Sequence, residues 1–225
     1  MNISFDKFEE YLLDYDKFDY YLCDHMKSFA PYFNEIPGKE HYRFLAYISS
    51  LYDNINILDI GTSKGLSALA MSYNSSNIVN TYDITDMTRG SDIIKRQNIN
   101  FHIKDLFDSF DDNKELFFSS HIIFLDIDPH EGTREYKFYE WLKEHNYPGL
   151  IICDDILHFK DMRNNFWNKV EDKYKYDVTK YGHWSGTGFI IFNSNFTFPN
   201  PDIQESFPEN ILLKTDGLTQ RKINK

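Results

Sequence analysis

The chain has 225 residues, of which 41% are hydrophobic, and its formal net charge is −11. A chain of this length and composition can bury a sizeable core, which excludes a disordered protein and favours a single domain over residues 1–225. The balance of 24 basic against 35 acidic residues argues against DNA or RNA as a partner, because proteins that bind nucleic acids neutralise phosphates with clustered Lys and Arg.

The N-terminal segment, residues 1–53, is expected to form a helical cap ahead of the sheet. Aromatic and leucine residues recur at helical spacing from about Ser4 to Phe29, and acidic residues crowd the early turns, as helix starts prefer. The pair Pro37-Gly38 interrupts this pattern, and a second helix is predicted over residues 39–52. Such helices can cover the sheet or act as a lid over a ligand site.

Strand and helix patterns alternate over residues 56–192, the predicted catalytic core, as parallel α/β units do. Two further segments are expected to close the sheet as a strand pair, and residues 197–225, which contain several prolines, to form an irregular tail. The sequence therefore predicts a mostly parallel, seven-stranded sheet with helices on both faces. The strands are predicted at 56–60, 77–83, 99–103, 121–126, 149–154, 176–179 and 188–192, and the helices at 64–73, 88–97, 111–118, 133–146 and 159–171.

A glycine loop joins the first predicted strand to its helix. A buried strand, a tight glycine turn and a helix start mark the usual place for a nucleotide-like ligand in an open α/β sheet. The spacing fits neither the dinucleotide fingerprint nor the phosphate-binding loop. The pattern Asp59-x-Gly61-x-x-x-Gly65 resembles motif I of the class I S-adenosylmethionine (SAM) methyltransferases. This resemblance implies a Rossmann-like fold and SAM as cofactor, with Thr62 and Ser63 beside it and Asp59 near its positive groups.

Acidic residues lie at or just beyond the carboxyl ends of the predicted strands. Asp59, Asp83, Asp126 and Asp154 end four strands, and Asp105 follows a fifth. Ligands of open α/β sheets bind at this edge. Asp83 is placed to accept hydrogen bonds from both ribose hydroxyls. Asp105 could meet the adenine amino group, or it could cap the helix that follows.

The fourth and fifth predicted strands end in Asp126-x-Asp128 and Asp154-Asp155. In a doubly wound sheet these strands are neighbours, so their tips would bring three or four carboxylates together. Like charges that close repel each other unless a cation neutralises them. Ligation by oxygen atoms alone, with positions left for water and substrate, suits Mg²⁺. The alternative is that Asp155 caps the next helix and Asp128 starts a turn.

The same residues resemble the macrocin O-methyltransferase-like family, metal-dependent enzymes that often methylate sugar hydroxyls. They are also similar to catechol-type O-methyltransferases. The resemblance implies metal ligation by Asp126, Asp154 and Asp155.

The general base is where the chain departs from these families. Asp128 stands where the macrocin-like family places its proposed base. The lysine base of the catechol-type enzymes falls on Pro129, so a lysine mechanism does not carry over. His130 becomes a second candidate base.

A glycine-rich segment, residues 180–188, lies between the last two predicted strands. If the penultimate strand is parallel to the rest, this segment overhangs the acceptor pocket. His183 could then hydrogen-bond a substrate hydroxyl, and Trp184 could stack on a sugar face. The alternative is a hairpin whose tryptophan packs on the core.

The expected function is divalent-metal-dependent methyl transfer from SAM to a hydroxyl of a small polyol. A sugar or a glycosylated metabolite is the acceptor that we expect first. A catechol-type phenolic O-methyltransferase and a non-catalytic SAM-binding scaffold are the alternatives. No apolar run reaches the roughly 18 residues of a membrane span, the start lacks the pattern of a secretory signal, and two cysteines give no disulfide framework. We therefore expect a cytoplasmic protein with a small-molecule hydroxyl acceptor and no membrane partner, which could form a homodimer.

Overall fold

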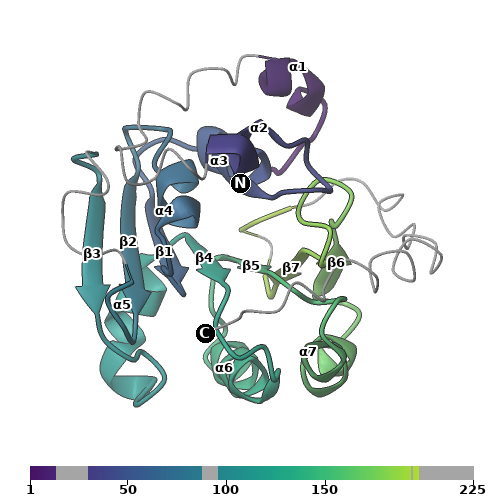
Figure 1. The fold of residues 1–225 in the computed structure, drawn as a ribbon. Helices are drawn as coiled ribbons and strands as arrows, with labels where there is room; N and C mark the ends of the chain where they lie inside the picture. The colour runs from purple at the N-terminus through teal and green to yellow at the C-terminus, as the bar shows by residue number, and fades with distance from the viewer. Residues whose placement is uncertain (14–29, 88–95, 194, 198–225) are drawn as a thin grey trace, which may run out of the picture.

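The structure, a computed structural model, describes residues 1–13, 30–87, 96–193 and 195–197. Seven strands form one sheet in the order β3-β2-β1-β4-β5-β7-β6 (Figure 1). This confirms the predicted seven-stranded sheet. Its strands are β1 (Asn56–Ile60), β2 (Ile78–Asp83), β3 (Ile99–Ile103), β4 (Ile122–Leu125), β5 (Leu150–Cys153), β6 (Lys175–Asp177) and β7 (Gly188–Ile191).

Strand direction decides which loops meet at one edge of the sheet. Strands β1 to β5 pair in parallel, whereas β7 is antiparallel to both β5 and β6. Strand β6 therefore runs in the same direction as β1 to β5, and its carboxyl end lies at their edge. The strand order reverses between β1 and β4, and ligands of open α/β sheets bind at such a point. The loop after β6 thus overhangs the edge that the sequence assigns to the site.

Helices cover both faces of the sheet, as predicted. Alternate side chains of a strand point to opposite faces, so Ile57 packs in the core on one side and Leu58 in the core on the other. No helix in the described parts of the chain is long and apolar enough to cross a bilayer. Helices α3 (Tyr42–Ser50) and α4 (Leu66–Met71) pack in the first of these cores, and α5 (Lys114–Ser119), α6 (Thr133–Glu144) and α7 (Lys160–Asn165) pack in the second.

The N-terminal cap contains helices within its described residues. It contains α1 (Phe8–Leu13) and α2 (Ala30–Asn34) before α3. The rest of the helix predicted from Ser4 to Phe29, most of the one predicted at 88–97, and nearly all of the tail lie outside the described residues. The helix predicted over 39–52 begins only at Tyr42, with His41 as its N-cap. Lys39 and Glu40 therefore belong to the loop before the helix.

Two predicted helices differ from the structure at backbone irregularities. The helix predicted at 64–73 begins at Leu66, because Gly65 has φ +82°, a left-handed conformation that cannot continue a helix. The helix predicted at 159–171 breaks at Phe166, where φ is −122°, into α7 and a short 3₁₀ turn over Trp167–Lys169.

Candidate active site

A cavity of about 400 Å³ opens at the carboxyl edge of the sheet, where β1, β2, β4 and β5 end. Its wall takes in residues from the glycine loop, the strand ends, the cap and the loop after β6. Of the predicted site residues, Gly61, Ser63, Asp83 and Asp105 line one part of it. Asp126, Asp128, His130, Asp154, Asp155 and His183 line the other part.

The glycine loop is shaped by its contact with β4. Gly61 has φ +102°, and a Cβ atom there would lie 1.6 Å from the carbonyl oxygen of Asp126. Only glycine fits this approach and this backbone conformation. The amides of Gly61 and Thr62 donate to the carbonyl of Tyr82, at 2.9 and 3.2 Å. The loop is therefore fixed between β2 and β4, and Thr62 lies buried within it.

Asp59 lies beneath the glycine loop and contributes nothing to the cavity wall. Its Oδ2 accepts hydrogen bonds from the hydroxyls of Thr81 at 2.6 Å and Ser67 at 3.1 Å. Its Oδ1 has no hydrogen-bond partner among the described residues. Burial raises the pKa of this carboxyl to about 7. An effect of Asp59 on SAM would therefore act through the loop or through charge, and the predicted role stays a prediction.

The raised pKa of Asp59 makes folding stability depend on pH. The unfolded carboxyl ionises near its ordinary pKa of about 3.9, whereas the folded one ionises near 7. Its stabilising contribution is therefore complete below about pH 4 and is lost as the pH rises through 7. Relative to wild type, Asp59→Asn should gain on the order of 4 kcal/mol of unfolding free energy between pH 4 and pH 8. Urea unfolding at a series of pH values measures this difference.

Asp172→Asn is the control for losing one acidic group, because the Asp172 side chain is 93% exposed. Its unfolding free energy should parallel that of wild type across the same pH range. A difference between Asp59→Asn and wild type that stays constant from pH 4 to pH 8 would contradict the assignment of a raised pKa.

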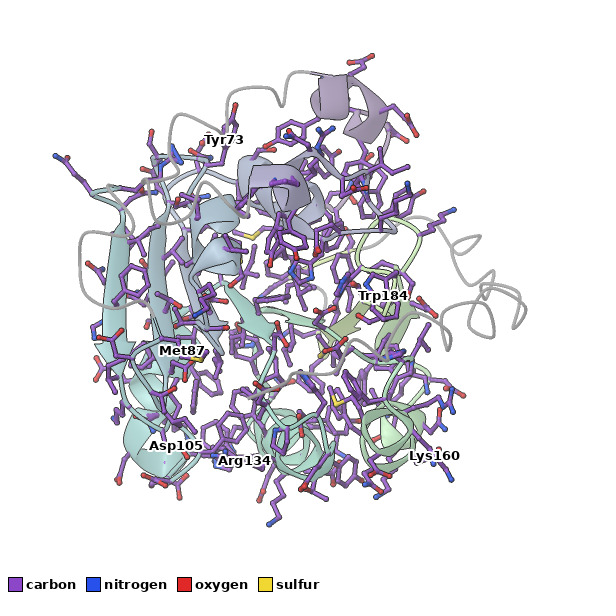
Figure 2. The ribbon with its side chains drawn as sticks, in the orientation of Figure 1. Tyr73, Met87, Asp105, Arg134, Lys160 and Trp184 are labelled. Carbon is purple, nitrogen blue, oxygen red and sulfur yellow. The ribbon has the colours of Figure 1, made fainter. Side chains whose placement is uncertain are left out.

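Asp83 and Asp105 both reach the cavity, but their surroundings differ. Asp83 accepts hydrogen bonds from the backbone amides of Ser63 and Thr85, at 2.8 and 3.0 Å, and so ties β2 to the glycine loop. Asp105 receives Arg134 Nη2 on both carboxylate oxygens, at 2.7 and 2.6 Å. The two side chains lie together in Figure 2. Asp105 therefore forms an ion pair with Arg134 on α6. Neither predicted role of Asp105 included this contact.

The three predicted metal ligands, Asp126, Asp154 and Asp155, are divided between two groups of possible ligands that share only Asp155. Ligand atoms of Asp126, His130 and Asp155 lie within 4.8 Å of one another, and so do those of Asp154, Asp155 and His183. Burial, and then the charges of Asp154 and Asp155, raise the pKa of Asp126 well above its usual range. Burial and the charge of Asp154 also raise the pKa of Asp155. The ionised carboxylates at the rim are therefore stabilised when a proton or a cation offsets part of their negative charge.

Asp154 differs from its neighbours because two imidazoles face it. His183 Nδ1 lies 3.1 Å from Asp154 Oδ2 and 3.3 Å from Oδ1, and His41 Nδ1 lies 3.1 Å from Oδ2. Burial alone would raise the pKa of Asp154, but these imidazoles outweigh it and hold the pKa below its usual range. Burial alone would lower the pKa of His183, but Asp154 raises it to about 9. Asp154 is thus part of a histidine network as well as of the acidic rim.

The two candidate bases are in contact with each other. His130 Nε2 lies 3.1 Å from Asp128 Oδ1 and 3.2 Å from Asp155 Oδ2, and its ring stacks on Phe159 at 4.6 Å between centroids. The Asp128 side chain is 91% exposed. His130 and Asp155 have positive φ, +55° and +58°, a conformation that is uncommon for residues other than glycine. His130 therefore connects the exposed candidate base to the acidic rim.

Sequence reasoning missed two residues of the wall, Glu40 and His41. Both looked like the first turn of a helix, but α3 begins after them, and both line the cavity. The turn at Pro37-Gly38 just before them was the available signal. Trp184, by contrast, does not reach the cavity wall: it is half-buried, with its ring against His158 at 4.6 Å and His183 at 5.5 Å.

Comparison with known proteins shows which fold this architecture belongs to. No protein-family model and no curated protein matches the chain. Among solved structures, the chain is similar to an O-methyltransferase from Bacillus cereus in complex with S-adenosylhomocysteine, with 20% identity and a TM-score of 0.50 over 68% of this chain and 80% of that one. It is also similar to a Staphylococcus aureus protein provisionally named a caffeoyl-CoA O-methyltransferase, with 19% identity and a TM-score of 0.52 over 84% of this chain and 100% of that one. At these identities the likeness concerns the fold: the chain has the Rossmann-like fold of the class I methyltransferases.

Proposed function

We propose that the chain is a divalent-metal-dependent O-methyltransferase that acts on a hydroxyl of a small polyol, a sugar or glycosylated metabolite, with SAM as methyl donor. One observation carries this proposal. The carboxylates of two neighbouring strands, led by Asp126 and Asp155, lie on the wall of the same cavity that the glycine loop lines. A ligand at the loop and a cation at the rim would therefore share one enclosed space.

The loop side of the cavity suits the nucleoside part of SAM. Asp83 offers carboxylate oxygens where a ribose diol would donate, and Leu106 and Met87 add apolar wall next to it. The cavity has no cluster of basic residues at the loop among its described lining, as befits a ligand without phosphate. When bound, SAM supplies a methyl group on a positively charged sulfur.

The rim side suits a hard divalent cation. Asp126 and Asp155 supply oxygen ligands, His130 can supply a nitrogen, and Asp154 lies beside Asp155. Burial and the charges of Asp154 and Asp155 raise the pKa of Asp126, which supports a cation or a proton at this cluster. A cation held there lowers the pKa of a bound hydroxyl and fixes its orientation.

The chain's own groups can take the proton that the acceptor hydroxyl loses. Asp128 is exposed at the mouth of the cavity and His130 lies 3.1 Å from it. A proton accepted at either group can be shared across that contact and released to solvent from the exposed carboxylate. Asp128 and His130 therefore remain joint candidates for the general base.

A methyl-transfer assay tests the proposal. We expect turnover of polyols with adjacent hydroxyls in the presence of SAM and Mg²⁺, loss of turnover in excess chelator, and recovery when Mg²⁺ is restored. Calorimetric titration with SAM, with and without Mg²⁺, shows whether the two ligands are coupled. Full activity in excess chelator would contradict metal dependence, and SAM binding without turnover or metal coupling would favour a scaffold role.

A phenolic acceptor is the second candidate. The similarity to the Staphylococcus aureus protein provisionally named a caffeoyl-CoA O-methyltransferase favours it, and so do the aromatic residues Tyr42, Tyr82 and Phe107 on the cavity wall. Both candidates require the cation, so the chelator experiment does not separate them. Parallel assays with sugars and with catechols do, since only the true acceptor class should be turned over at low concentration.

A further inference from the structure

A second cluster of potential metal ligands lies on the cavity wall, formed by Glu40, His41 and His183. The first two come from the loop before α3, and the third comes from the loop between β6 and β7. One ligand atom from each lies within 4.8 Å of the other two. None of these three residues belongs to the group of Asp126, His130 and Asp155.

The two loops are held together by contacts outside the cluster. The amide of Gly38 donates to the carbonyl of Gly182 at 2.6 Å. The ring of Phe5 stacks on that of Tyr181, with centroids 4.0 Å apart and planes 2° from parallel. The cap and the β6–β7 loop are therefore joined next to the cluster, which places its three ligands without help from a bound ion.

The two imidazoles are arranged alike, between two carboxylates. Each has its Nδ1 atom 3.1 Å from Asp154 Oδ2. Their Nε2 atoms lie toward Glu40 Oε1, at 3.9 Å for His41 and 3.6 Å for His183. These two distances exceed a hydrogen bond of 2.7–3.2 Å. They match the roughly 3.0–4.2 Å between donors that each lie about 2.1 Å from one ion.

His41 is almost fully buried, with a side chain only 5% exposed. Its Nδ1 atom faces Asp154 Oδ2 at 3.1 Å without a hydrogen bond to any described residue. Its Nε2 atom, on the other side of the ring, faces Glu40. Nε2 is therefore the atom of His41 that can bind an ion beside Glu40.

We propose that Glu40, His41 and His183 form a second cation site, distinct from the group of Asp126, His130 and Asp155, for a first-row transition-metal ion. Two imidazoles and one carboxylate make a donor set that suits Zn²⁺, Fe²⁺ or Co²⁺ better than Mg²⁺. Asp154 is the outer carboxylate: it is hydrogen-bonded to His183 Nδ1 and lies 3.1 Å from His41 Nδ1, where carboxylates lie behind metal-binding histidines. With three protein ligands, the ion keeps positions open toward the cavity for water or an oxygen of a substrate.

Titration with Co²⁺ tests this site, because its visible absorption reports nitrogen and oxygen ligands directly. The full chain is stripped with chelator, returned to excess Mg²⁺ to fill the acidic rim, and titrated with Co²⁺ while bound metal is counted. We expect one Co²⁺ per chain that Mg²⁺ does not displace. Glu40→Gln and His41→Gln should each weaken it by at least about 10-fold.

Two variants serve as matched controls. His145→Gln removes an imidazole whose Nδ1 lies 2.9 Å from the carbonyl of Trp141 on α6, away from the cavity, and should bind Co²⁺ like wild type. Asp126→Asn removes a ligand of the acidic rim and should keep the Mg²⁺-resistant Co²⁺. This second control separates the inference from the proposed function, whose failure would appear in methyl transfer and not in the Co²⁺ count.

The proposal is overturned if wild type binds no Mg²⁺-resistant Co²⁺, or if Glu40→Gln binds it as tightly as wild type does. Thermal unfolding of each metal-free variant shows whether it folds. If the His41→Gln variant does not fold, the Co²⁺ affinity of the Glu40→Gln variant tests the proposal alone. A folded His41→Gln that binds Co²⁺ like wild type would also overturn it.

Discussion

An Asp126→Asn variant should lose at least about 100-fold in methyl-transfer rate and bind SAM with nearly unchanged affinity, because even outer partners of metal ligands cost 10–100-fold when removed. Asparagine keeps the size of the side chain and removes the charge that a cation at the rim would require. The Asp126 side chain lies with Asp155 and His130 on the cavity wall, and its backbone carbonyl, which faces Gly61 of the glycine loop, is not changed by the substitution. The turnover number at saturating Mg²⁺ and the calorimetric affinity for SAM measure the two effects separately.

The same variant should be at least as stable as wild type when no metal is present. It removes a carboxyl group whose pKa is raised by burial and then by the charges of Asp154 and Asp155. Loss of activity without loss of stability would therefore exclude misfolding as the cause. Asp172→Asn, on an exposed surface, should retain full activity. If Asp126→Asn retains the wild-type rate, the rim does not hold the cation that the reaction is proposed to use.

Gly61→Ala should destabilise the fold by more than about 3 kcal/mol. The added Cβ would stand 1.6 Å from the carbonyl oxygen of Asp126, and φ at this position is +102°. Relief would require β1 and β4 to separate where they are hydrogen-bonded, since the amide of Asp126 donates to the carbonyl of Ile60 at 3.0 Å. Urea unfolding measures the loss, and weakened SAM binding should accompany it because the glycine loop moves with the strand.

Gly38→Ala is the matched control. Gly38 also has a left-handed backbone, with φ +89°, but a Cβ there would lie 3.4 Å from the carbonyl oxygen of Lys180, at ordinary contact distance. The control therefore carries the conformational cost of about 1–2 kcal/mol without the overlap. Equal losses of unfolding free energy in the two variants would contradict the prediction, because they would mean that β1 and β4 can move apart at little cost.

The sheet could be predicted because its information is local. Each central strand is an apolar run that ends near an aspartate, and the rule that parallel strands share a carboxyl edge brings those aspartates together. This reasoning located β1, β3 and β5 to within a residue at each end, and it led to a cavity wall that includes Asp83, Asp126 and Asp155.

The rest of the wall could not be predicted because tertiary contacts decide it. Glu40 and His41 fit a helical pattern as well as a loop, and contacts between the cap and the β6–β7 loop, such as the hydrogen bond from Gly38 to Gly182, set their position. Asp105 lines the cavity and also pairs with Arg134, 29 residues later in the chain, a contact that neither predicted role included. Neither partner is visible in the spacing of residues around a motif.

The joining of the cap to the β6–β7 loop has a consequence for how the polypeptide matures. Gly38 and Gly182 lie on either side of the first six strands in the sequence, so their hydrogen bond closes a long loop. During synthesis, the segment that carries Glu40 and His41 leaves the ribosome before all seven strands, and His183 follows only after β6. This wall of the cavity can therefore be completed only after nearly the whole sheet sequence has been made.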